Sequence, residues 1–135
     1  MPSELRHVLT ILAVEDLAAS SAFYRAGFDW TPVVETPVYV EFALPGGQRL
    51  GLYQRDGFGR NTGQLPVRIG DGQLAPTELY FHTDDPDGAI ARLERAGAHL
   101  LSPLAARDWG DQAAYFADPS GNVLVVARPI EGGAQ

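Results

Sequence analysis

Few side chains in this 135-residue sequence have the types and spacing that metal or covalent chemistry needs. The chain contains no cysteine, and its ten basic residues are all arginine. These absences exclude thiolate nucleophiles, cysteine-ligated zinc, Schiff-base chemistry and a P-loop. No nucleophile elbow, HExxH motif or strand-linked GxGxxG motif is present. We therefore assign no catalytic residue, and we expect no metal and no other cofactor.

The composition narrows the class of protein. A formal net charge of −7 without a basic cluster argues against nucleic-acid binding. No apolar run approaches the roughly 18 residues that span a bilayer, so we expect no membrane segment. The start, MPSELRHVL, lacks a secretory signal pattern, which favours a cytoplasmic location. Hydrophobic residues make up 45% of the chain, an ordinary value for one compact domain.

The first half, residues 1–55, reads as strand, helix and three strands. Strands are predicted over His7–Val14, Phe28–Glu35, Val38–Leu44 and Gln48–Arg55, and a helix follows Asp16 as N-cap. The second half, residues 77–135, repeats this order. Its strands are predicted over Thr77–Thr83, His99–Ala106, Gln112–Ala117 and Val123–Arg128, with a helix that starts at Pro86. The two halves are therefore two βαβββ modules, which predicts an α+β fold with mixed sheets.

Short sequence motifs recur at equivalent positions in the two halves. The acidic pairs Glu15-Asp16 and Asp84-Asp85 end the first strand of each module, and the tripeptide RAG closes each helix. This coincidence supports an internal repeat. Between the modules, residues 56–76 are rich in glycine and proline and show no clear periodicity. We expect an inter-module loop there, either a plain linker or a lid over a pocket.

Three stretches carry a resemblance to a known family: HVLTILAVEDLAASSAFYRAGF, ELYFHTDDPDGAIARLERAGA and WGDQAAYFADPSGNVLVVARP. Across nearly its whole length the chain resembles the glyoxalase, bleomycin-resistance and dioxygenase superfamily, also called the vicinal oxygen chelate superfamily. In character it is most similar to the metal-free bleomycin-resistance branch. The resemblance implies curled sheets around a cavity, with the modules paired edge to edge or exchanged between chains, and it implies a homodimer.

Enzymes of this superfamily hold one divalent metal through inward-facing strand residues. The resemblance places their four ligand positions at Leu9, Gly51, Glu78 and Val125, so one position in four is polar. A divalent ion would lose more hydration than such a site returns. A relocated site at His7 and His82 is disfavoured, because each two-residue step along a strand moves a side chain about 6.6 Å.

Strand alternation, taken in phase with those four positions, predicts the pocket lining. The out-of-phase residues Leu50, Leu52, Leu79, Phe81 and Leu124 are expected to pack against helices. The candidate ligand-binding residues are His7, Tyr39, Glu41, Tyr53, Glu78, Tyr80, His82, Trp109, Asp111 and Tyr115.

An aromatic pocket with carboxylates suits planar or cationic ligands. We therefore expect a metal-free protein that sequesters an aromatic or cationic small molecule such as an antibiotic. Two alternatives stay open: a glyoxalase-type or lyase-type enzyme with a rebuilt active site, in which Glu78 is a candidate general base, and an accessory binding protein of a natural-product pathway.

Overall fold

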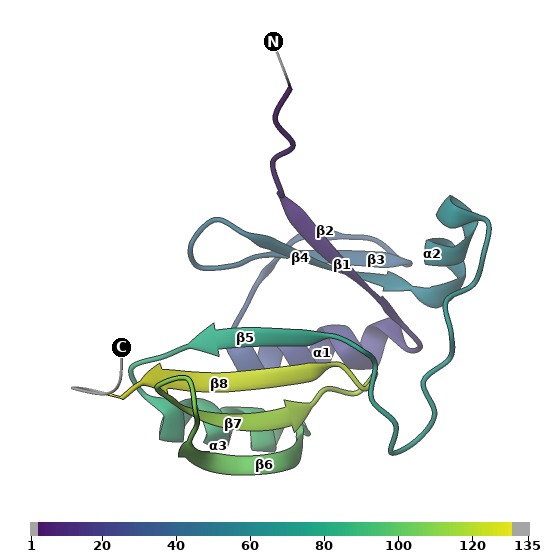
Figure 1. The fold of residues 1–135 in the computed structure, drawn as a ribbon. Coiled ribbons are helices and arrows are strands. Elements are labelled where there is room, and N and C mark those ends of the chain that lie inside the picture. The colour runs from purple at the N-terminus through teal and green to yellow at the C-terminus, as the bar shows by residue number, and fades with distance from the viewer. Residues whose placement is uncertain (1–2, 131–135) are drawn as a thin grey trace. The chain divides into compact units, whose positions relative to one another are not determined.

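The computed structural model describes residues 3–130, and these residues form two compact units that we treat separately (Figure 1). The first unit comprises the residues up to Leu17 together with Trp30–Pro66. The second comprises Ala18–Asp29 and the residues from Val67 onward. Each unit contains one four-stranded mixed sheet. The predicted α+β fold with two mixed sheets is confirmed, and each sheet is open.

The first sheet has the strand order β1-β4-β3-β2. Strand β1 pairs with β4 in parallel, and the other neighbours pair antiparallel. The strands are β1 (Leu9–Val14), β2 (Pro32–Glu35), β3 (Tyr39–Ala43) and β4 (Arg49–Gln54).

The second sheet repeats this pattern with the order β5-β8-β7-β6, in which β5 pairs with β8 in parallel. Strand β7 pairs antiparallel with both β8 and β6. Its strands are β5 (Glu78–His82), β6 (His99–Ala106), β7 (Asp111–Ala117) and β8 (Val123–Pro129). The shared order and pairing agree with the repeat read from the sequence.

Helices α1 (Leu17–Phe28) and α3 (Pro86–Ala96) lie on one side of the second sheet (Figure 1). Phe28 of α1 contacts Phe81 of β5, with ring centroids 4.8 Å apart. The predicted strand that started at Phe28 is wrong at this end, because Phe28 closes α1 and β2 begins at Pro32. Tyr24 stacks on Phe28 one helical turn away, at 5.6 Å, and the two rings extend the apolar face of the helix.

The helix α3 is bounded as its sequence predicts. Pro86 occupies the first turn, and the Asp85 side chain accepts a hydrogen bond from the Gly88 amide at 3.1 Å. This cap satisfies an amide that has no partner within the helix.

The segment 56–76, expected as a loop, contains most of the short helix α2 (Arg55–Thr62), followed by an irregular stretch. The sequence did not predict this helix because α2 contains glycine, which has a low helix propensity, at positions 57 and 59. A Cβ on Gly57 would lie 2.4 Å from Cε1 of Tyr53, so the missing side chain admits the tyrosine ring. Arg55 anchors the start of α2 by donating two hydrogen bonds to the Pro66 carbonyl, at 2.7 and 3.1 Å.

Burial does not separate the two phases of the central strands, because in-phase Val125 is as buried as out-of-phase Leu124, and Leu79 is only partly buried. Leu50, Leu52 and Leu124 are at most 2% exposed, and Phe81 packs on α1. Among residues 3–130, none of the helices has the length and apolar character to cross a membrane.

Candidate functional site

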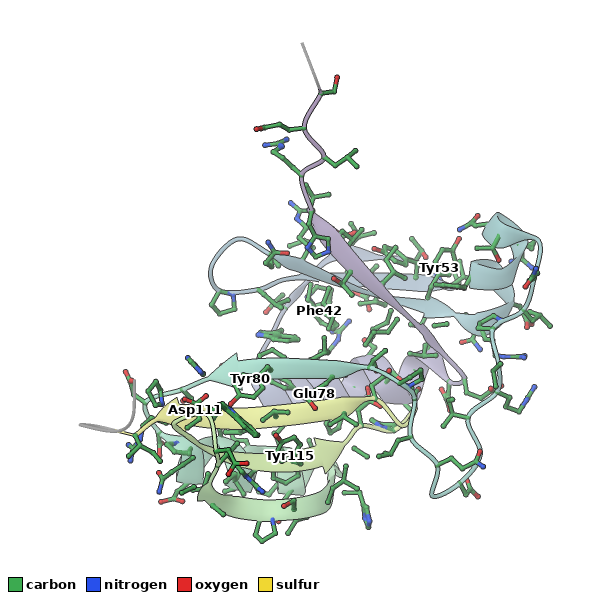
Figure 2. All side chains as sticks on the ribbon, viewed as in Figure 1. Phe42, Tyr53, Glu78, Tyr80, Asp111 and Tyr115 are labelled. Carbon is green, nitrogen blue, oxygen red and sulfur yellow. The ribbon has the colours of Figure 1, made fainter. Side chains whose placement is uncertain are left out.

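The second sheet carries a cluster of rings around one carboxylate, which we call the aromatic–carboxylate cluster: Tyr80, His82, Trp109 and Asp111. Tyr80 and His82 flank Phe81 on β5, so they lie on the sheet face opposite α1. Asp111 begins β7, and Trp109 lies in the turn before it. Figure 2 labels Tyr80 and Asp111 at the end of the sheet where this cluster lies.

A chain of hydrogen bonds joins these side chains. Trp109 Nε1 donates to Tyr80 Oη at 2.7 Å, and Tyr80 Oη donates to Asp111 Oδ2 at 2.5 Å. His82 Nε2 lies 3.3 Å from the same carboxylate oxygen. Asp111 is buried, whereas Tyr80 is 39% and Trp109 56% exposed. The carboxylate thus fixes two aromatic rings that remain open to solvent.

The protonation states of the cluster follow from these contacts. The hydrogen bond from Tyr80 lowers the pKa of Asp111, and His82 adds to this effect. Desolvation and the bond to Asp111 raise the pKa of Tyr80. Near neutral pH, Asp111 is therefore an anion and Tyr80 a neutral phenol. A hydrogen-bonded carboxylate with a lowered pKa and a protonated phenol are poor proton acceptors, so neither Asp111 nor Tyr80 is suited to proton abstraction.

Tyr115 of β7 lies on the same face, because its strand partner Val125 is also the partner of Tyr80. One face of the Tyr115 ring is covered by Arg107, whose guanidinium carbon lies 5.0 Å from the ring centroid. Arg107 also donates to the carbonyls of Ala113 and Pro103, at 2.8 and 2.9 Å. These bonds hold the irregular β6–β7 pairing together. The sequence does not point to Arg107, because the carbonyl groups that it contacts become available only through the irregular β6–β7 pairing.

Glu78 begins β5 opposite Val123 and is exposed (Figure 2). It belongs to the same sheet face as Tyr80, two residues away on the strand. Its carboxylate is not part of the hydrogen-bonded cluster. A role for Glu78 toward a ligand therefore stays a prediction.

Three of the predicted residues meet on the first sheet, in the other unit. Tyr39 Oη donates to Glu41 Oε1 at 2.7 Å, and the Tyr39 and Tyr53 ring centroids are 5.2 Å apart. Arg49, which sequence analysis did not select, donates from Nη1 to Glu41 Oε2 at 2.7 Å. The bonds from Arg49 and Tyr39 lower the pKa of Glu41. The sequence alone carries no signal for Arg49, because Arg49 and Glu41 meet only through the register of β3 against β4.

His7 does not join either group. It precedes β1, is exposed, and its Nε2 lies 3.0 Å from Thr10 Oγ1. The strand predicted from His7 begins instead at Leu9.

The four positions that the family resemblance assigns to metal ligands carry one polar side chain among them. Val125 is fully buried and aliphatic, and Leu9 is aliphatic. The space beside Gly51 is occupied by the Tyr39 ring, and Glu78 supplies the one carboxylate. Within residues 3–130, no three His, Cys, Asp or Glu side chains are grouped so that they could hold a metal ion.

Comparison with known proteins identifies the family. The model of the Glyoxalase/Bleomycin resistance protein/Dioxygenase superfamily matches residues 4–126. The chain belongs to this superfamily. The anthracycline biosynthesis protein DnrV of Streptomyces peucetius is 34% identical over 125 residues, covering 87% of this chain and 44% of DnrV. The chain thus spans less than half the length of this relative.

Solved structures agree with this assignment. A glyoxalase/bleomycin resistance protein/dioxygenase from Nocardioides superposes with a TM-score of 0.81 at 25% identity, covering 100% of this chain and 91% of its own. A glyoxalase-related enzyme from Fulvimarina pelagi gives the same TM-score and identity, covering 91% of this chain and 87% of its own.

Proposed function

We propose that this chain binds a planar aromatic compound carrying a positive charge, without a metal ion, and sequesters it. The observation that carries the proposal is the aromatic–carboxylate cluster, in which buried Asp111 orients two exposed rings. Rings that are fixed before binding lose little conformational entropy when a ligand stacks on them. The π faces of tyrosine and tryptophan, beside an ionised carboxylate, favour a cation.

The ligand class is supported from a second direction. DnrV is by name an anthracycline biosynthesis protein. Anthracyclines are, as a chemical class, fused ring systems that often carry an amino sugar. We propose a compound of this shape and charge as the ligand, with antibiotic sequestration or an accessory pathway role as the biological outcome. A homodimer, expected from the family resemblance, and a cytoplasmic location are both part of the proposal.

The test uses one ring system with two side groups. We expect 9-(aminomethyl)anthracene to bind more tightly than neutral 9-(hydroxymethyl)anthracene, as measured by ligand fluorescence. Trp109→Ala and Asp111→Asn should each weaken binding of the amine about tenfold, the size of a favourable cation–π contact.

Glu94→Gln is the matched control, because Glu94 is an exposed carboxylate on α3. It should leave the affinity unchanged. Equal binding of amine and alcohol, or variants at positions 109 and 111 that bind like the control, would remove the proposal. Chemical turnover of a bound compound would instead support the rebuilt-enzyme alternative.

A further inference from the structure

On the first sheet, the Tyr39 ring fills the space beside Gly51, a position that the family resemblance assigns to a metal ligand. A Cβ on Gly51 would lie 2.3 Å from Tyr39 Oη and 2.8 Å from Cε1 and Cζ of the same ring. No side chain at position 51 is compatible with Tyr39 where it stands. The glycine at the family's ligand position and the placement of the Tyr39 ring are therefore one structural feature.

The Tyr39 ring is held in place at its hydroxyl. Its hydrogen bond to Glu41 is 2.7 Å long, and the Tyr53 ring meets it edge-on at an interplanar angle of 62°. Tyr39 is partly exposed, whereas Glu41 is only 8% exposed. The two tyrosines thus form a fixed aromatic surface on the first sheet, with an ionised carboxylate beneath its edge.

Arg49 lies at that edge, and part of its guanidinium is available to donate hydrogen bonds to a ligand. Its side chain is 50% exposed, while that of its partner Glu41 is 10% exposed. Within residues 3–130, its guanidinium is engaged through Nη1, which leaves Nε and Nη2 available as donors. A guanidinium fixed by a buried carboxylate presents these donors in a defined plane, the arrangement that suits an oxygen anion.

We propose that Tyr39, Tyr53 and Arg49 form a second binding surface, which takes the carboxylate-bearing edge of a planar aromatic anion. One tyrosine ring stacks on the ring system and the other, set at 62° to it, meets the edge of the ligand, while Arg49 donates to the carboxylate. This surface has the opposite charge preference from the aromatic–carboxylate cluster on the second sheet. Each surface is tested with a probe of its own charge, so the failure of one proposal leaves the other standing.

The experiment compares anthracene-9-carboxylate with 9-(hydroxymethyl)anthracene by ligand fluorescence. The carboxylate should bind the wild-type protein more tightly. Arg49→Met should weaken carboxylate binding 10-fold or more and abolish the preference over the alcohol, because a charge-assisted hydrogen bond is lost. Arg49→Lys should fall between the two, since lysine keeps the charge and loses the planar fork.

Arg60→Met is the matched control, because Arg60 is an exposed arginine on α2 in the same unit. It should bind the carboxylate like the wild type. Because Arg49→Met leaves Glu41 without its cation, the double variant Arg49→Met/Glu41→Gln supplies a neutral background that protects the fold, and thermal melting verifies it. Wild-type protein that binds acid and alcohol equally, or a folded double variant that binds the acid like the Arg60 control, would overturn the proposal.

Discussion

The central strands β4 and β8 occupy the same place in two sheets of identical order, yet they carry different residues. In the first sheet the middle row across the ladder is Ile11, Gly51 and Glu41. In the second sheet the corresponding row is Tyr80, Val125 and Tyr115. One sheet buries a carboxylate beside a glycine, and the other buries a valine between two tyrosines. Two sheets with the same strand pairing therefore carry a buried carboxylate at one central position and an aromatic ring at the equivalent position.

The turns that precede these strands sharpen the comparison. Both have the same backbone hydrogen bonds: Leu44 N to Gln48 O in the first, at 2.8 Å, and Asp118 N to Asn122 O in the second, at 2.9 Å. The second turn adds a buried carboxylate. Asp118 accepts from the Ser120 and Asn122 amides at 2.9 and 2.8 Å, and from Tyr24 Oη of α1 at 2.5 Å.

The sequence DPSGN, residues 118–122, is thus a structural tie in the second unit. The Asp118 carboxylate accepts hydrogen bonds from backbone amides and from the buried Tyr24. The strand that follows the turn, β8, carries Val125. The first turn has glycines at positive φ, Gly46 and Gly47, and lacks an equivalent carboxylate.

The largest predicted effect separates the two turns. Asp118→Ala removes the carboxylate that accepts from two turn amides and from Tyr24, so it should lower the free energy of unfolding by about 3 kcal/mol or more. Gln48→Ala, at the exposed position of the first turn that corresponds to Asn122, should change it by less than about 0.5 kcal/mol. Urea unfolding followed by circular dichroism measures both. Similar midpoints for the two variants would contradict the assignment of DPSGN as a structural tie.

A smaller effect tests the difference between the central strands. Gly51→Ala should destabilise the protein by about 1–2 kcal/mol, because the new methyl displaces the Tyr39 ring and its bond to Glu41. In a Tyr39→Ala background the same change should be neutral, or stabilising by up to about 1 kcal/mol, because alanine restricts the unfolded chain more than glycine. A double-mutant cycle by thermal unfolding gives the coupling. An equal cost in both backgrounds would mean that Tyr39 does not depend on Gly51.

Much of the fold could be predicted from the sequence because strand alternation and capping are local signals. The repeat, the helix at Pro86 and the burial of Leu50, Leu52 and Leu124 all rest on such signals. The sequence-based predictions are wrong where a contact with a residue far away in the sequence determines the secondary structure. Phe28 joins α1 because Phe81 and Tyr24 receive its ring, and α2 forms in a glycine-rich segment where Gly57 admits the Tyr53 ring.

The candidate sites follow the same rule. The structure brings Tyr80, His82 and Asp111 into contact on one sheet, and Tyr39, Glu41 and Tyr53 on the other, and their role toward a ligand stays a prediction. Alternation cannot find Arg49 or Arg107, because their partners are set by strand register and by the irregular β6–β7 pairing. Nor does it separate His7, which alternation would place with Leu9 although β1 starts later.

The most direct test of the central claim, that this chain binds its ligand without a metal ion, is calorimetric titration of chelator-treated protein with an amino-sugar anthracycline. The family's metal site offers one carboxylate here, with an aromatic ring beside Gly51 and buried valine at position 125. We expect the same affinity, within about twofold, before and after chelation and after addition of Zn²⁺, Mn²⁺ or Ni²⁺. Binding that disappears on chelation and returns with one of these ions would contradict the account.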